Sequence, residues 1–328
     1  MTMISVTHKV GRHCASTGIR DMMNHYGIKW SEAMCFGISA GLGIWYLDIP
    51  DSSPSRLMHT RSADMEEQFF RRIGVDFSWE QHRDPAVSEK MLLRRLDQGR
   101  PALLRTDIYH LPYYNTRTHF PAHVIMVWGY DRQKQVFLVT DTERQEPIEV
   151  AFADMRRARY ADGGFFAMAG DFFAPGHIEI PDNMPDVIQD AVMVQSRTLL
   201  DDSLDFQGMA GLDKWEKELD QWKAFPDWQW TARFTYQVIE KRGTGGGGFR
   251  LMYADFLREA GEYIPAVARS GLADRMHAVG LAWQDLAYAL KLASENKKPD
   301  FREVAVELKK VEKLEKAYHR EVIGLLGN

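Results

Sequence analysis

The segment between residues 122 and 141 constrains the fold more than any other part of the chain. It contains two apolar stretches, AHVIMVWGYD and QVFLVTD, which have the composition of β-strands. Only the polar segment 131–135 separates them, so we expect an antiparallel hairpin with Tyr130 opposite Val136 and Ile125 opposite Asp141. Helix patterns precede this hairpin in the sequence, which indicates an α+β domain.

Three local signals predict shorter elements before the hairpin. Ser31 and Ser62 are each expected to be the N-cap of a helix. The segment 75–82, VDFSWEQH, is expected to form a short strand.

The sequence divides into two regions of different texture. Residues 1–175 mix helix and strand patterns, whereas residues 176–328 are helical apart from short breaks such as RGTGGGGFR. The last segment, 299–327, places apolar residues at steps of three and four, which is typical of an amphipathic helix packed on the body of a protein. We therefore expect a catalytic domain over 1–175 and a mostly α-helical C-terminal domain over 176–328 that covers or completes the active site.

Composition and charge argue against several classes of function. The net charge of −5 gives no electrostatic reason to expect a nucleic acid as partner. No apolar run approaches the roughly 20 residues of a membrane-spanning helix, and the amino terminus lacks the apolar core of a signal peptide. The two cysteines, Cys14 and Cys35, are too few for a disulfide framework. We expect a cytoplasmic protein with no membrane partner, and a homodimer is left open.

Cys14 is the candidate nucleophile. It stands in GRHCASTGIRDMMNHYG at the start of a predicted helix, where the helix dipole stabilises a thiolate. A cysteine nucleophile needs a base and a group that orients the base. In the expected hairpin His123 and Asp141 form a diagonal pair on one face, roughly 7–8 Å apart at the backbone. Each residue also has a structural interpretation: a buried thiol, a strand histidine and a turn aspartate.

The order Cys14, His123, Asp141 resembles that of the papain-like enzymes. HFPAHVIMVWGYD followed by VFLVTD resembles the histidine and aspartate strands of the C39-like cysteine peptidases. GRHCASTGIRDMMNHYG with SEAMCFGISAGLGIWYL resembles the butirosin biosynthesis protein H family, and GTGGGGFRLMYADFLREA resembles the helical domain that commonly follows it. The resemblance implies a papain-like or C39-like cysteine-peptidase fold with an added helical domain.

The same resemblance implies an activity and a set of site residues. Cys14 would be the nucleophile, His123 the general base and Asp141 the residue that orients it. This triad would move an acyl group from an acyl carrier protein, or a pantetheine thioester, to a small-molecule or peptide amine in natural-product biosynthesis. The protein itself would need no cofactor, because the donor substrate carries the phosphopantetheine. Thr142 follows Asp141, where the C39-like pattern often has proline.

The residues before Cys14 suggest how an oxyanion would be bound. Papain relatives place a glutamine about six residues before the cysteine as one oxyanion donor, and His8 occupies that place here. The backbone N–H of Cys14 would be the other donor. His13 is equally near in sequence and is expected to orient the loop or contact the substrate.

Two glycine-rich segments allow opposite interpretations. RGTGGGGFR lacks the lysine and hydroxyl residue of a phosphate-binding P-loop after Gly248, so it is either a flexible helix connection or a substrate-binding loop. In the second case Gly246 lies in the loop and Arg250 meets a phosphopantetheine phosphate. Gly41 and Gly43 indicate close backbone packing near the nucleophile more than a nucleotide site, and they are further candidates for contact with the substrate. His119 and His123 are four residues apart, but Pro121 between them argues against a helical zinc pair, and we expect no metal.

Three functions therefore stay open from the sequence. The first is a cysteine-dependent N-acyltransferase that forms an amide from a carrier-protein thioester. The second is a cysteine hydrolase that cuts a peptide, an amide or a thioester. The third is a non-catalytic binding module in which Cys14 is a structural residue.

Overall fold

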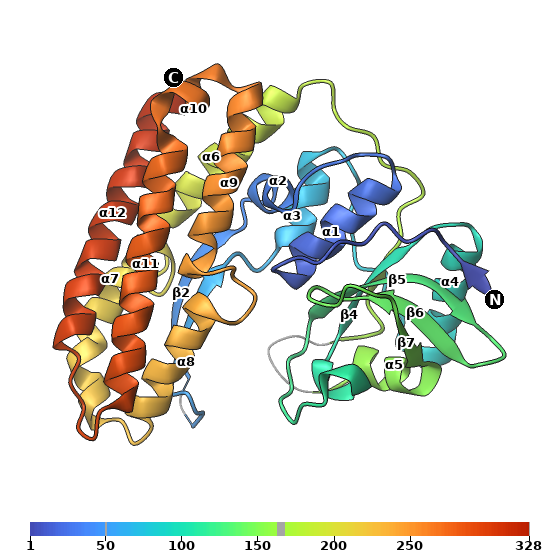
Figure 1. Cartoon of the computed structure of the whole chain (residues 1–328), viewed down its shortest axis with the longest axis horizontal. Coiled ribbons are helices and arrows are strands. Elements are labelled where there is room, and N and C mark those ends of the chain that lie inside the picture. Colours follow the sequence, from blue (N-terminus) through green and yellow to red (C-terminus); the bar gives the residue numbers. More distant parts are fainter. Residues whose placement is uncertain (50, 163–167, 328) are drawn as a thin grey trace. The chain divides into compact units, whose positions relative to one another are not determined.

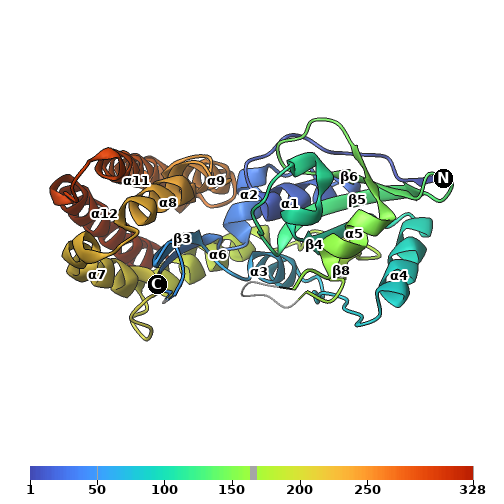
Figure 2. The same ribbon diagram turned by 90° about the horizontal axis from the view of Figure 1, so that it is seen from below.

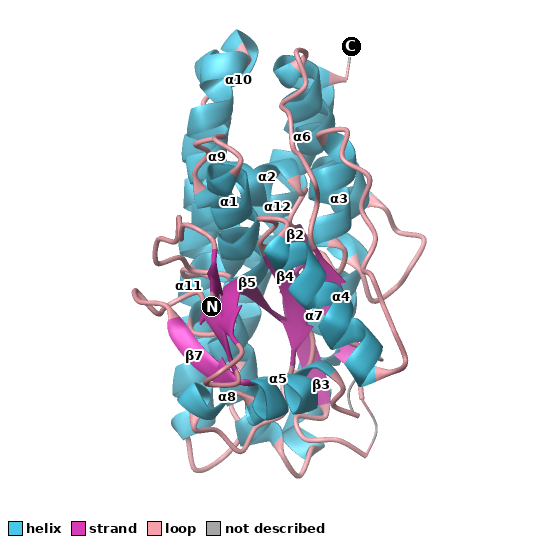
Figure 3. Cartoon of the chain, turned by 90° about the vertical axis from the view of Figure 1, so that its right-hand side faces the viewer, coloured by secondary structure: helices cyan, strands magenta, loops and turns pink. Residues whose placement is uncertain are grey.

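The computed structural model describes residues 1–49, 51–162 and 168–327, and it mixes helices with strands (Figure 3). The chain forms two compact units: Met1–Cys35 with Ile73–Pro181, and Phe36–Arg72 with Asp182–Asn328. The sequence analysis places residues 36–72 in the first domain, whereas in the structure they cluster with the second unit, because their two strands pack against its helices. Among the described residues, no helix combines the length and the apolar character needed to cross a bilayer.

The first unit is built on an antiparallel sheet. Its strands run in the order β7-β6-β5-β4-β8, and β1 pairs with the far end of β5. The strands are β1 (Thr2–Met3), β4 (Ala102–Thr106), β5 (His123–Asp131), β6 (Val136–Thr140), β7 (Ile148–Ala151) and β8 (Phe172–Phe173). The predicted hairpin is confirmed as β5 and β6, and it lies at the centre of the unit.

Helices cover both faces of this sheet (Figures 1 and 2). The helical segments are α1 (Cys14–His25), α2 (Glu32–Ile38), at which the two units meet in sequence, α4 (Pro85–Asp97), α5 (Phe152–Arg159) and the short turns η1 (Ile108–His110) and η2 (Pro112–Tyr114). On one face, α1 approaches β4 and β5 closely, since a Cβ on Gly18 would lie 2.6 Å from the Leu103 side chain. On the other face, the ring of Phe152 in α5 packs 4.4 Å from that of Phe137 in β6.

The register of the central hairpin contains a bulge that the sequence does not reveal. Next to the turn, Asp131 rather than Tyr130 pairs with Val136. The register then shifts by one residue between Val127 and Gly129, and Met126 pairs with Thr140. Beyond the bulge the strands therefore follow the predicted alignment, which places Asp141 and His123 on the same face. The prediction is wrong at the turn and correct at the end of the hairpin that carries the candidate site.

Of three other local predictions, one is confirmed and two are wrong. Ser31 is confirmed as the N-cap of α2, because its hydroxyl accepts the N–H of Met34 at 2.9 Å. Ser62 is not the cap of the next helix, since α3 begins three residues later (Met65–Arg72). The strand expected over 75–82 is reduced to a single bridge between Glu80 and Phe172.

The second unit is mainly helical. It begins with a two-stranded sheet and continues with a series of helices packed around α11 (Figure 2). Its elements are β2 (Leu42–Asp48), β3 (Arg56–Arg61), α3, α6 (Met184–Leu200), α7 (Gly208–Glu218), η3 (Leu219–Ala224), α8 (Trp228–Glu240), η4 (Gly247–Phe249), α9 (Arg250–Tyr263), α10 (Pro265–Ser270), α11 (Leu272–Glu295) and α12 (Arg302–Leu326). The amphipathic C-terminal helix is confirmed as α12, with Val304, Leu308 and Val322 buried.

Arg250 is the charged centre of this unit. It is 0% exposed and bonds to Glu315, which is also 0% exposed. Glu315 further accepts the indole N–H of Trp283 at 2.7 Å and lies 2.9 Å from Nε2 of His319. Burial raises the pKa of Glu315, but the charge of Arg250 and these hydrogen bonds lower it to about 2. The remaining Arg250 donors contact the carbonyl oxygens of Gly43, Thr60 and Gly248. The expectation that Arg250 meets a phosphate does not fit this buried position.

We expect Glu315→Gln to destabilise the protein strongly, because it leaves the buried guanidinium of Arg250 without its counter-charge. Breaking a buried pair from one side costs about 3–5 kcal/mol. The matched control is Glu321→Gln, which removes the half-exposed partner of Arg275 and should cost at most about 1 kcal/mol. The free energy of unfolding in urea measures both, and equal losses would contradict the central role of Arg250.

Candidate active site

Cys14 is the first residue of α1, at the positive end of the helix dipole. His13 caps the helix: its backbone is extended, and its Nδ1 accepts the N–H of Ser16 at 3.4 Å. The residue Cys14 as a whole is half-buried. The local fold therefore gives Cys14 the surroundings in which a thiolate is stabilised.

His123 and Asp141 meet at the end of the central hairpin. His123 is the first residue of β5, and Asp141 directly follows β6. Nε2 of His123 lies 2.9 Å from Oδ1 and 3.0 Å from Oδ2 of Asp141. The His123 ring also interacts electrostatically with Cys14. Because Nε2 faces the carboxylate, Nδ1 is the ring nitrogen left for the sulfur.

The electrostatic interactions among these three residues shift their pKa values in directions that favour their charged forms. Burial raises the pKa of Cys14, but the electrostatic interactions with His13 and His123 outweigh burial and hold the pKa well below its usual value. Burial lowers the pKa of His123, but the charges of Asp141 and Cys14 raise it to about 10. Burial raises the pKa of Asp141, yet its contacts with His123 lower it to about 2. These shifts favour a thiolate–imidazolium pair next to a carboxylate.

Two tyrosines that the sequence analysis missed hold Asp141 in place. Tyr113 and Tyr114, both in the turn η2, donate their hydroxyl groups to Oδ2 at 2.7 and 2.9 Å. Thr142 donates its backbone N–H to Oδ1 at 2.8 Å. The two tyrosines are adjacent in a loop between predicted elements, and no spacing rule connects them with Asp141, which is 28 positions from Tyr113 and 27 from Tyr114.

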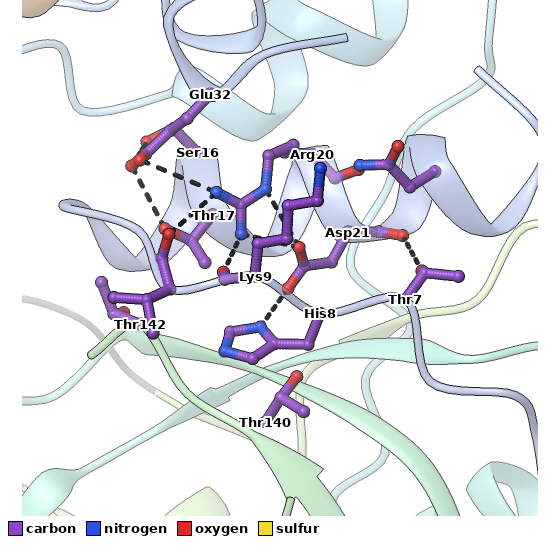
Figure 4. A network of polar contacts seen from close by, with 12 residues as sticks. Thr7, His8, Lys9, Ser16, Thr17, Arg20, Asp21, Glu32, Thr140 and Thr142 are labelled. Carbon is purple, nitrogen blue, oxygen red and sulfur yellow. Dashed lines mark hydrogen bonds and ion pairs between the residues drawn. The ribbon is translucent and has the colours of Figure 1, made fainter. Parts of the chain in front are cut away.

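Glu32, which the sequence analysis also missed, anchors the loop in front of Cys14 (Figure 4). It accepts the backbone N–H groups of Arg12 and His13 at 3.0 and 2.9 Å. It also accepts the hydroxyl groups of Ser16 and Thr17, in the first turn of α1, at 2.9 and 3.1 Å. One carboxylate thus ties the N-cap and the first helical turn together, which fixes the position of Cys14 between them.

His8 and His13 have different positions relative to Cys14. Nε2 of His13 lies 3.9 Å from the sulfur. His8 instead faces Asp21, with 2.5 Å between Nδ1 and Oδ2, and its Nε2 lies 2.8 Å from the carbonyl oxygen of Arg144 (Figure 4). Both ring nitrogens of His8 therefore have protein partners, and the oxyanion role expected for His8 does not fit this arrangement.

The other predicted contact residues belong to the second unit. A Cβ on Gly43 would lie 2.2 Å from the carbonyl oxygen of Arg61, so this glycine allows the close approach of β3. A Cβ on Gly41 would lie 2.8 Å from the ring of Phe36. Gly246 has a φ of +88° and adjoins Gln284 and Glu240. These glycines, like Arg250, have packing roles inside the second unit.

The comparisons with known proteins cover most of the chain. The family model described as "Butirosin biosynthesis protein H, N-terminal" matches residues 13–142. The family model described as "Domain of unknown function (DUF4872)" matches residues 153–322. A search of curated proteins found no match. The first match contains Cys14, His123 and Asp141.

We expect Cys14 to be alkylated as a thiolate at a pH well below the range of an ordinary thiol, whose pKa is about 8.5. The alkylation rate against pH, followed by mass spectrometry of the Cys14 peptide, measures its ionisation, and the buried Cys35 is the internal control. In His123→Ala the midpoint should move up, because one positive neighbour and its hydrogen bond are lost while the burial remains. Superimposable profiles for the two proteins would contradict the ion pair.

Tyr113→Phe should reduce the free energy of unfolding by about 1.5–3 kcal/mol, the contribution of a hydrogen bond to a charged group. In an Asp141→Asn background the same change should cost only about 1 kcal/mol or less, because the bond is then between neutral groups. Tyr109→Phe is the control, since Tyr109 is 44% exposed, and it should change stability by no more than about 0.5 kcal/mol. Equal costs in both backgrounds would show that Tyr113 does not act on the carboxylate.

Proposed function

The chain belongs to the family of two-domain proteins in which a butirosin biosynthesis protein H N-terminal domain precedes a domain of unknown function, and from this premise we propose that it is a cysteine-dependent acyltransferase of natural-product biosynthesis. The observation that carries the proposal is the thiolate–imidazolium pair of Cys14 and His123 at the start of α1. The proposed fold of the first domain is papain-like. It is supported by a helix that begins with the cysteine and by an antiparallel hairpin that supplies the histidine and the aspartate in that order.

In the first half-reaction, the Cys14 thiolate attacks the carbonyl carbon of an acyl-pantetheine thioester. A bond forms between the sulfur and this carbon, and the carbonyl electrons move onto the oxygen. When the tetrahedral intermediate collapses, the bond to the pantetheine sulfur breaks. The leaving thiolate takes a proton from the His123 imidazolium. The product is an acyl-Cys14 thioester, so one thioester replaces another at little net cost.

In the second half-reaction, an amine attacks the acyl-Cys14 carbonyl. His123, now neutral, accepts the proton that the amine loses as the new carbon–nitrogen bond forms. The bond to the Cys14 sulfur breaks, and the thiolate–imidazolium pair is restored. Asp141 keeps Nε2 of the ring bonded throughout, so Nδ1 stays directed at the reacting atoms.

We assign the oxyanion donors to the backbone N–H of Cys14 and to Nε2 of His13. The N–H groups of a first helical turn have no acceptor within the helix. His13 brings a ring nitrogen to 3.9 Å from the sulfur, whereas His8 is held by Asp21 and Arg144. Donors that are fixed before the reaction stabilise the developing oxyanion without reorganisation.

The choice of an amine over water as acceptor rests on the family, not on the geometry of the triad. A cysteine hydrolase would form the same acyl-enzyme and discharge it with water. The donor is proposed to be an acyl carrier protein that presents a phosphopantetheine thioester, and the acceptor a small-molecule or peptide amine.

The test is the intact mass of the protein after incubation with a panel of acyl-pantetheine thioesters. We expect one acyl group on the wild-type chain and on Cys35→Ala, and none on Cys14→Ala. Candidate amines are then added to the acylated protein, with buffer alone as the control. Discharge that requires an amine and yields an amide supports the transferase.

The other results are equally informative. Discharge in buffer at an undiminished rate would make the protein a hydrolase. No adduct with any thioester, together with ordinary alkylation of Cys14, would favour the non-catalytic binding module.

A further inference from the structure

A second group of chemically active side chains lies in the first unit, apart from the triad. Asp107 directly follows β4, His110 ends η1, and His119 lies in the loop before β5. Each of them offers one ligand atom, and these three atoms all lie within 4.8 Å of one another. The sequence analysis paired His119 with His123 instead and excluded a metal. In the structure His123 is bonded to Asp141, and His119 has a different set of neighbours.

The carboxylate of Asp107 is oriented by the backbone around it. The residue is 2% exposed, and its Oδ1 accepts the N–H groups of Tyr109 and Phe120 at 3.0 and 2.9 Å. Its Oδ2 lies 2.7 Å from Nδ1 of His119. Burial raises the pKa of Asp107, but the bonds with His119 and the two N–H groups lower it below its ordinary value. One oxygen is thus fixed by the fold, and the ionised group directs the other toward the two histidines.

The imidazole rings are arranged by an aromatic contact. The Tyr109 ring stacks on His119 at 4.0 Å with an interplanar angle of 21°. The same tyrosine meets His110 edge to face at 4.9 Å. The His110 and His119 ring centres are consequently 6.0 Å apart. Outer contacts of this kind are typical of metal sites, where they orient the ligands.

We propose that Asp107, His110 and His119 form a binding site for a divalent transition metal such as Zn²⁺. Two imidazole nitrogens and one carboxylate oxygen suit zinc, and three protein ligands leave a position for water. Bonds of about 2.0–2.2 Å place the ligand atoms of a tetrahedral ion roughly 3.4 Å apart. To bind the ion, the hydrogen-bonded atoms of Asp107 and His119 must move slightly apart, and the two ligand atoms that are farthest from each other must move closer together. The His119 side chain, at 54% exposure, has room for this movement.

A metal at this site would join the two ends of the loop that carries Tyr113 and Tyr114. We call the two hydroxyl contacts that these tyrosines make with Asp141 the clamp. The loop between Asp107 and His119 contains η2, and thus Tyr113 and Tyr114. Bound metal would join both ends of the loop, as a cross-link does, and restrict its motion. The expected effect is stabilisation of the clamp, not direct participation in the chemistry of Cys14.

The test is a titration of metal-free Cys14→Ala protein with Zn²⁺ by isothermal calorimetry. This background is needed because Cys14, His13 and His123 could bind zinc themselves. We expect one equivalent of zinc, with affinity at least tenfold weaker after His119→Ala or His110→Ala. His177→Ala is the matched control, since His177 pairs with Glu179 at 2.8 Å as His119 pairs with Asp107. Among the described residues, His177 and Glu179 do not belong to a three-ligand cluster. Binding that is absent, or that resists both histidine substitutions, overturns the proposal.

A second measurement addresses the loop without any use of activity. Hydrogen exchange in the segment 108–118 should slow when zinc is added to the Cys14→Ala protein, and it should not change in the His119→Ala derivative. The Co²⁺ form should show ligand-field absorption without thiolate charge transfer in either background. Exchange that is indifferent to zinc would refute the coupling to the clamp, and thiolate bands in the Cys14-containing protein alone would locate the metal at the nucleophile instead.

Discussion

The contact between the carboxylate of Asp141 and the ring of His123 is the interaction on which the candidate site depends. A charge this deeply buried is costly unless it is paired and hydrogen-bonded. Asp141 meets this requirement with the His123 ring, two tyrosine hydroxyls and a backbone N–H. The same set of bonds fixes the direction of the imidazole, and so one carboxylate both satisfies its own burial and prepares the base for the sulfur.

This contact exists only because of the register of β5 against β6. Side chains alternate between the faces of a strand, so a shift of one residue would move Asp141 away from His123. The pairing next to the turn carries such a shift, and the bulge between Val127 and Gly129 removes it before the strands reach the site. Gly129 lies beside the bulge, where a Cβ would meet the carbonyl oxygen of Thr2 at 2.2 Å. The bulge is thus part of what aligns His123 with Asp141 in the candidate site.

The sequence predicted those parts of the protein that local patterns determine. The hairpin, the helix that begins near Cys14, the Ser31 cap and the amphipathic C-terminal helix all have a periodicity or a cap that can be read directly. The partners of the buried charged side chains could not be predicted from the sequence. Arg250 after a run of glycines looked like an anion contact, and only its pairing with Glu315, 65 positions away, reveals its burial. Tyr113, Tyr114 and Glu32 were missed for the same reason, since their partners are set by tertiary packing.

The two ionic centres show that burial and charge alone do not identify an active site. In the second unit, Arg250 and Glu315 are both 0% exposed, and the pair is enclosed by indole, imidazole and carbonyl partners. In the first unit, the network of charged residues ends at Cys14, a residue that is half-buried. In the proposed mechanism the sulfur must act both as nucleophile and as leaving group, which a fully enclosed group could not do. The difference in exposure, more than the strength of the ion pairs, is what distinguishes the candidate site from the enclosed pair of Arg250 and Glu315.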